Sequence, residues 1–245
     1  MIGSFLNVCI VRLPLDESLA TPRSHCRNCN EQIAWYDNLP IASFVALAGK
    51  CRHCGAPISR RYPLVEALTA ALFVAVSLRP FTAPELALQL AFVSLLVVIT
   101  FIDIDYLIIP DAISIPSILV APGLAFVVGH ITIVESLVGI VAGGGILWAF
   151  AAAYEKLRGQ EGMGFGDVKL LAMIGGVQGW QAVPFSLFVG ATVGALAGTA
   201  LLALGRGRLD SAIPFGPFLA LGALLYVVGG PELTAWYFSW TGPFG

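Results

Sequence analysis

The 245-residue chain has 13 Lys and Arg and 15 Asp and Glu, so only 11% of its residues are charged, against about 25% in an ordinary soluble domain. Hydrophobic residues make up 58%, and so few charges could not cover that much apolar surface in water. The composition excludes an ordinary soluble enzyme and a disordered chain, and the net charge of −2 gives no strong attraction toward nucleic acid. We therefore predict an all-α polytopic membrane protein.

Residues 1–13 form an apolar segment that is too short to cross a bilayer by itself. Residues 1–11 would make only about 16 Å of helix, whereas the hydrocarbon core is about 30 Å thick. The segment has no basic N-terminal region and no small-residue cleavage site, so it does not resemble a signal peptide. We expect it to be the remnant of a first transmembrane helix whose start lies upstream of this sequence.

Residues 14–62 form a polar segment, which holds 10 of the 28 charged groups and four of the five cysteines. It is rich in turn formers and too polar to cross lipid. We predict a small water-facing, cytoplasmic domain inserted between membrane spans. Its net charge of +6 −4 = +2 and its few aromatic neighbours make nucleic-acid binding the weaker interpretation, and we expect no nucleic-acid partner.

Two C-x-x-C pairs lie in this domain, separated by 21 residues. Each pair can form a tight turn that presents two sulfur atoms, and four thiolates suit a tetrahedral Zn²⁺ ion. Disulfides or free thiols are the alternative, and a cytoplasmic location disfavours disulfides. The predicted ligands of a structural zinc ion are Cys26, Cys29, Cys51 and Cys54.

Residues 63–245 are predicted to form a transmembrane domain, because long uncharged runs follow one another. A span needs roughly 20 apolar residues, and continuous rather than alternating apolar runs argue against a β-barrel. The run at 170–205 has 36 residues, enough for two spans, which we expect to be separated at 175–181. The predicted spans are 63–78, 86–102, 112–134, 136–154, two within 170–205, and 211–231, which makes seven, or eight with the N-terminal segment. Glycines four residues apart, which let membrane helices pack closely, occur at Gly139 and Gly143 and at Gly190, Gly194 and Gly198.

The distribution of Lys and Arg predicts the orientation, because basic residues collect on the cytoplasmic side. Counting spans forward from a cytoplasmic polar domain places eleven basic residues on that side and only Arg79 on the other. Lys169 lies within a predicted span. The eleven are Arg12, Arg23, Arg27, Lys50, Arg52, Arg60, Arg61, Lys156, Arg158, Arg206 and Arg208.

Acidic residues occur where a membrane protein rarely places them. Asp103, Asp105 and Asp111 lie near the end of one predicted span, and Asp167 lies near the start of a later one. Two spans separate the two clusters, so the span count brings both to the cytoplasmic side. Ionisable groups at membrane depth are by default functional. No Ser/His/Asp or Cys/His set competes with them, since His130 falls on the opposite side.

Two carboxylates a few ångströms apart share one proton. Such a pair suits peptide hydrolysis, because one carboxylate can accept a proton from water while the other donates to the scissile carbonyl oxygen. Asp103 and Asp105 are about 200° apart around a helix, so only one of them can face Asp167. Two alternatives remain: Asp111 and Asp167 could cap helices, and paired intramembrane carboxylates also serve proton-coupled transporters.

Taken together, these residues resemble the type IV prepilin peptidases, membrane aspartic peptidases that process pilins and type II secretion pseudopilins. The resemblance covers nearly the whole chain, although its last motif alone also occurs in presenilin-like proteases. The short first helix departs from the family pattern, as does Arg27, where the family often has Pro. The matching residues are Gly3-Ser4-Phe5-Leu6-Asn7-Val8, Arg12-Leu13-Pro14, both cysteine pairs, Trp35-Tyr36-Asp37-Asn38-Leu39-Pro40, Gly49-Lys50-Cys51, Ile58-Ser59-Arg60-Arg61-Tyr62-Pro63, Glu66, the stretch 103–111 and Gly164-x-Gly166-Asp167.

The resemblance implies cleavage of a prepilin or pseudopilin after a Gly, at the cytoplasmic face of the bacterial inner membrane. The short basic leader would stay in water, and the pilin's apolar helix would stay in the bilayer. Asp103 and Asp167 are then the catalytic acids. Candidates for supporting positions around them are Asp105, Asp111, Gly164, Gly166 and Lys169.

The resemblance also implies that the new N-terminal residue is N-methylated with S-adenosylmethionine. No glycine-rich dinucleotide motif after a strand supports this from the residues themselves. The basic candidates for this second site have an alternative role as anchors at an anionic membrane face. The candidates are Gly49, Lys50, Arg60, Arg61 and Glu66.

Overall fold

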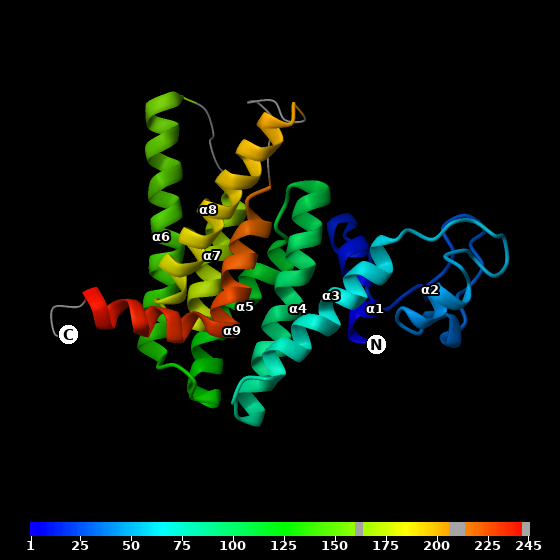
Figure 1. The fold of residues 1–245 in the computed structure, drawn as a ribbon, viewed down its shortest axis with the longest axis horizontal. Coiled ribbons are helices and arrows are strands. Elements are labelled where there is room, and N and C mark those ends of the chain that lie inside the picture. The colour runs from blue at the N-terminus through cyan, green and yellow to red at the C-terminus, as the bar shows by residue number, and fades with distance from the viewer. Residues whose placement is uncertain (160–163, 206–213, 242–245) are drawn as a thin grey trace. The chain divides into compact units, whose positions relative to one another are not determined.

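A computed structural model describes residues 1–159, 164–205 and 214–241, and within these ranges it contains helices and turns but no strands (Figure 1). The all-α prediction is therefore confirmed. The chain divides into two compact units, Met1–Leu78 and Arg79–Gly245. Arg206 and Arg208, which contributed to the predicted orientation, lie outside the described residues.

In the first unit, α1 (Ile2–Arg12) packs against α3 (Arg61–Ser77). Gly3 makes this approach possible, since a Cβ atom at that position would lie 2.9 Å from Glu66 Cα. Ser4 Oγ donates to Glu66 Oε1 at 2.5 Å, and Asn7 Nδ2 donates to the Tyr62 carbonyl at 3.1 Å. The predicted N-terminal segment and the first part of the predicted transmembrane domain thus belong to one unit. Between them lie η1 (Leu13–Leu15), η2 (Trp35–Asn38) and the short helix α2 (Ala42–Ala46).

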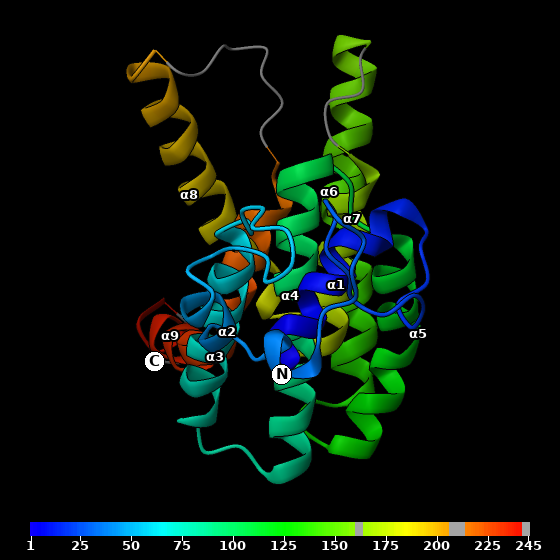
Figure 2. The same ribbon diagram turned by 90° about the vertical axis from the view of Figure 1, so that its right-hand side faces the viewer.

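Six helices form the second unit within the described residues. Successive helices run in opposite directions, so three helix C-termini and three N-termini share one end of the unit. Figures 1 and 2 show the C-terminal ends of the third and fifth of them, α6 and α8, reaching to the same side. The helices are α4 (Ala83–Tyr106), α5 (Asp111–Val128), α6 (Ile133–Arg158), α7 (Phe165–Gln178), α8 (Ala182–Ala203) and α9 (Gly216–Thr241).

Local signals in the sequence explain where these helices begin and end. Thr82 with Glu85 and Thr132 with Glu135 form capping boxes at the starts of α4 and α6, which satisfy the free N–H groups of a first turn. Gly179, with φ +87°, ends α7. The uncharged run 170–205 is therefore divided between α7 and α8 inside the predicted interval 175–181.

Each of the seven predicted spans corresponds to one helix, in order from α3 to α9, although the helix ends differ from the predicted limits. Within the described residues, five helices have the length and hydropathy of a membrane span: α4, α5, α6, α8 and the 216–234 part of α9. With 17 and 14 residues, α3 and α7 are shorter. The predicted number of seven to eight crossings therefore remains a prediction.

Helix α7 is the core of the second unit, since every residue from 170 to 178 is buried. It packs most extensively against α6. A Cβ atom on Gly139 would collide with the Gly175 carbonyl, and one on Gly143 would collide with the Leu171 carbonyl. These glycines let the two backbones touch, as the four-residue spacing of Gly139 and Gly143 predicted. A helix enclosed on all sides by protein can be apolar all round without facing lipid.

Candidate active site and metal centre

Asp103 lies in the last turn of α4 and is buried, with 5% of its surface exposed. Its Oδ2 atom accepts a hydrogen bond of 3.0 Å from the backbone N–H of Gly216, the first residue of α9. Asp105, two residues later on the same helix, is exposed. The helix ends at Leu107, which has a left-handed φ of 56°. The structure therefore buries one of the two neighbouring acids and leaves the other at the surface.

Asp167 lies in the first turn of α7 and is half-buried. The residue at the N-cap of this helix is Gly164, and the residue at the N-cap of α5 is Pro110. The capping alternative for Asp111 and Asp167 is therefore wrong, because both lie inside the first turn of their helices. Asp167 and Asp103 lie close enough for their charges to interact.

Ile109 connects the surroundings of the two acids. It is buried, with 7% exposed. A Cβ atom on Gly166 would lie 3.0 Å from Ile109 Cβ, and a Cβ atom on Gly216 would lie 3.3 Å from Ile109 Cδ1. One apolar side chain thus contacts the start of α7 beside Asp167 and the start of α9 beside Asp103.

Lys169 forms an ion pair with Asp111, the first residue of α5. The Lys169 ammonium also lies 5.7 Å from the centre of the Phe165 ring, within the range of a cation–π interaction. Of the predicted supporting positions, Gly166 and Lys169 therefore lie at the N-terminal end of α7, and Asp111 at the start of α5 is joined to Lys169. Gly164 and Asp105 are exposed.

The sequence predictions missed Ile109 and Gly216. Gly216 lies 113 residues after Asp103, and the residues next to Gly216 in the sequence do not indicate that it binds a carboxylate. The one local signal is Gly216-Pro217 at the start of an apolar run, since Pro is common in the first turn of a helix. That signal predicts a helix start and no contact.

The four predicted zinc ligands come together in the first unit. The Sγ atoms of Cys26, Cys29, Cys51 and Cys54 all lie within 4.8 Å of one another, and none of these cysteines is in a disulfide. The Cys26 and Cys54 sulfurs are 3.8 Å apart. Four sulfurs placed tetrahedrally at 2.3 Å from one zinc ion would be about 3.8 Å apart. The donor set and its spacing therefore fit a metal ion such as zinc.

Each cysteine pair lies on the same kind of tight turn. Asn30 N–H donates to the Cys26 carbonyl, and Gly55 N–H donates to the Cys51 carbonyl. Asn30 and Gly55 both have positive φ, at 57° and 69°, which Asn and Gly tolerate best. Both turns are closed by antiparallel bridges, His25 with Gln32 and Lys50 with Pro57.

Backbone N–H groups in these turns point at the sulfurs. The N–H groups of Cys29 and Asn28 lower the pKa of the Cys26 thiol to about 6, and the N–H group of Ala56 lowers the pKa of Cys54. The Glu31 N–H group also lowers the pKa of Cys29, but desolvation and the three neighbouring sulfurs raise it further, to about 12. A bound metal ion would stabilise the thiolate form of all four cysteines, because a metal ion binds thiolates rather than thiols.

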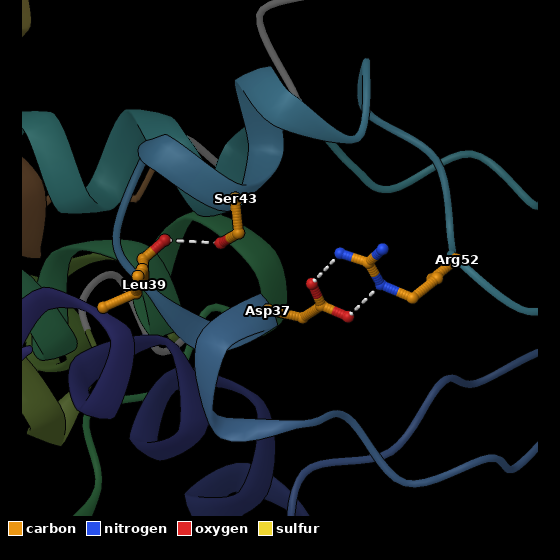
Figure 3. Close-up of polar contacts among 4 residues, drawn as sticks. All are labelled: Asp37, Leu39, Ser43 and Arg52. Carbon is orange, nitrogen blue, oxygen red and sulfur yellow. Dashed lines mark hydrogen bonds and ion pairs between the residues drawn. The ribbon is translucent and has the colours of Figure 1, made fainter.

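Arg52, inside the second cysteine pair, ties that turn to η2. Figure 3 shows its guanidinium bound in a two-pronged ion pair to Asp37, with Nε–Oδ2 and Nη2–Oδ1 distances of 2.7 and 2.6 Å. The same guanidinium lies 5.6 Å from the centre of the Tyr36 ring. Arg52 lowers the pKa of Asp37 below its ordinary value. In the same view, Ser43 Oγ donates to the Leu39 carbonyl at 2.5 Å.

The candidates for a methyl-transfer site border the second cysteine turn. Gly49 has a φ of +69°, and its carbonyl accepts a hydrogen bond of 2.7 Å from the N–H of Ile58, two residues before Arg60. Lys50 pairs with Pro57. Glu66 is already engaged on both oxygens, by Ser4 Oγ and by Ile41 N–H at 2.8 Å.

Comparisons with known proteins match both units. The model of the bacterial peptidase A24 N-terminal domain matches residues 1–80, and the model of the type IV leader peptidase family matches residues 90–199. A prepilin leader peptidase/N-methyltransferase of Aeromonas hydrophila is 41% identical over 98% of this chain and 91% of its own length. Proteins of the same name from Pseudomonas putida and Pseudomonas aeruginosa are 34% and 32% identical, over 96% and 99% of this chain and 89% and 91% of their own lengths. No solved structure matches the chain.

Proposed function

The chain belongs to the type IV leader peptidase family, and we propose that it is a membrane-embedded aspartic endopeptidase that removes the leader from type IV prepilins or type II secretion pseudopilins. The observation that most supports this proposal is that two acids from separate helices lie close enough for their charges to interact. Asp103 of α4 is buried, and its charge acts on Asp167 of α7. The named relatives are prepilin leader peptidases.

In the proposed mechanism, Asp103 and Asp167 hold one proton between them. The ionised carboxylate accepts a proton from a water molecule, whose oxygen attacks the scissile carbonyl. The protonated carboxyl donates to the carbonyl oxygen. The acid that took the proton from water then gives it to the leaving nitrogen, and the hydroxyl proton returns to the other acid as the tetrahedral intermediate collapses, which breaks the C–N bond and releases the new amine. The ion pair between Asp111 and Lys169 would hold the start of α5 against the N-terminal end of α7.

We place this reaction at the cytoplasmic face of the bacterial inner membrane. The support is the predicted bias of basic residues to one side and the common end shared by the C-terminus of α4 and the N-terminus of α7. Five helices suited to crossing a bilayer agree with a multi-pass protein in which the pilin's apolar helix stays in lipid.

A second activity, N-methylation of the new N-terminus, is proposed from the names of the relatives. S-adenosylmethionine would supply the methyl group to the amine. Gly49, Lys50, Arg60 and Arg61 are the proposed positions for this site. Because both oxygens of Glu66 are engaged within the first unit, we propose that Glu66 holds α1 and the 39–42 turn to α3. The four cysteines would hold a structural zinc ion.

One experiment tests the main proposal. The purified protein in lipid vesicles is incubated with a prepilin, and the product is weighed by mass spectrometry. We expect loss of a leader-sized mass, and gain of one methyl group only when S-adenosylmethionine is added. Intact prepilin in every sample, with proton flux across the vesicles, would instead support the proton-coupled transporter.

A further inference from the structure

We propose that Gly216 is a positioning residue for Asp103, whose backbone N–H fixes the orientation of the catalytic carboxylate and whose missing side chain makes room for it. This inference rests on the proposed peptidase function and extends it to a residue at the start of α9. It gives α9, which carries neither acid, a direct part in the active site.

The hydrogen bond is the first observation. Gly216 N–H donates to Asp103 Oδ2 at 3.0 Å, and both residues are buried. The N–H groups of a first helical turn have no partner within their own helix. In α9 the helical hydrogen bonds begin with Phe218 and Leu219, both of which donate to the Phe215 carbonyl. Gly216 N–H is therefore free to bind the carboxylate.

The space around the bond is the second observation. A Cβ atom on Gly216 would lie 2.6 Å from Asp103 Oδ2, a distance that real Cβ atoms do not tolerate, and 3.2 Å from Asp103 Cγ, which is tight. The other side is closed by Ile109 Cδ1, which would be 3.3 Å away. Any residue larger than glycine must displace either the carboxylate or the start of α9.

The bond also has a chemical consequence. The last torsion angle of an Asp side chain is broad and roughly two-fold, so a carboxylate without a fixed donor samples many orientations. A backbone N–H at a helix start is a rigid donor that prefers a negative partner. With Oδ2 held by Gly216, Oδ1 is the oxygen left to contact the attacking water and the facing acid.

A packing role alone would predict a different response to substitution. Packing glycines lower stability and protein level when they are enlarged, whereas a positioning glycine lowers the rate of the chemical step. Gly229 provides the matched control, since it lies in the same helix and a Cβ atom there would meet nothing within 4 Å. Both changes add one methyl group to α9.

The experiment compares Gly216→Ala with Gly229→Ala in the full-length protein in vesicles, using prepilin as substrate. For Gly216→Ala we expect kcat to fall by about 100-fold, the usual cost of misplacing a catalytic group by about 1 Å, with KM and the unfolding midpoint near the wild-type values. Gly229→Ala should match wild type in all three. A Gly216→Ala protein with wild-type kcat would overturn the inference, as would equal losses in the two variants.

A second variant covers the case in which Gly216→Ala fails to accumulate. Pro217→Ala loosens the start of α9 without adding an atom near Asp103, because only proline fixes its own φ. We expect it to lower kcat about tenfold at unchanged KM, and an unchanged kcat would overturn the inference. If wild type does not cleave prepilin, the proposed function itself fails. If wild type cleaves, Asp103→Asn does not, and Gly216→Ala does, only the role of Gly216 is refuted.

Discussion

Lys169, two residues after Asp167 on α7, forms an ion pair with Asp111, the first residue of α5. The Lys169 side chain is 20% exposed and the Asp111 side chain 59% exposed, so water reaches the pair and weakens it. The pair nevertheless joins the start of α5 to the N-terminal end of α7, which carries the proposed catalytic acid. We therefore expect the pair to contribute more to the alignment of α5 with α7 than to the stability of the fold.

Neutralising this pair should slow the reaction modestly. For Asp111→Asn we expect kcat to fall roughly two- to fivefold, the range expected for a partly exposed pair of up to about 1 kcal/mol, with normal protein in the membrane. Initial cleavage rates at saturating prepilin provide the measurement. Asp111→Glu, which keeps the charge, should recover most of the activity. If Asp111→Glu and Asp111→Asn were equally impaired, the charge would not be the relevant property.

The two proposed catalytic acids should be indispensable. Asp103→Asn and Asp167→Asn each remove one proton carrier, and we expect cleavage to fall by at least about 10²- to 10⁴-fold at an unchanged membrane level. Asp105→Asn is the control, since that carboxylate is exposed and should be dispensable for the chemistry. Leader release by mass spectrometry measures all three. Full cleavage by either of the first two variants would remove that residue from the pair.

The cysteine cluster should bind one zinc ion per chain. Elemental analysis of purified protein checks the stoichiometry, and Cys26→Ser combined with Cys51→Ser should abolish it, because two of four ligands are lost. We expect residues 24–58 of the variant to become sensitive to protease while the helices of the second unit stay resistant. Cys9→Ser serves as the control, since Cys9 is buried in α1. Metal-free wild type with four reactive thiols would contradict the zinc site.

The pair of Asp37 and Arg52 predicts a pH dependence of the cysteine domain. Arg52 lowers the pKa of folded Asp37 below the unfolded value of about 3.9. The stabilisation is therefore complete above about pH 4 and is lost as the pH falls through the folded pKa. Hydrogen exchange of residues 34–39, corrected for its intrinsic pH dependence, should accelerate over that range in wild type. Asp37→Asn should exchange faster already at neutral pH and show no such step, and a step that persists in Asp37→Asn would assign it to another group.

The sequence predicted the helices and the clustering of the four cysteines because both depend on local patterns. Apolar runs report burial or lipid contact wherever they occur, and a C-x-x-C pair brings two sulfurs together within one turn. The break at Gly179 was equally local. In each case, neighbouring residues along the chain hold the information.

Contacts between segments that are distant in the sequence could not be predicted from local patterns. Nothing near Gly216 indicates that its N–H binds Asp103, and nothing near Ile109 indicates that it contacts the starts of two helices. Asp103 and Asp105 are chemically alike, and only the packing of α4 against α9 buries the first and exposes the second. The engagement of Glu66 by Ser4 and Ile41 likewise depends on the fold of the first unit.

The enclosure of α7 has a consequence for how the enzyme responds to its lipid environment. Bilayers of different thickness act on helices through mismatch between apolar length and hydrocarbon depth. Only 22%, 22% and 11% of the spans of α5, α6 and α8 are buried inside the protein, and these helices would accommodate such a mismatch by tilting. Residues 170–178 of the helix that carries Asp167 are all buried. We therefore expect a change in bilayer thickness to affect the position of that acid only indirectly, through the surrounding helices.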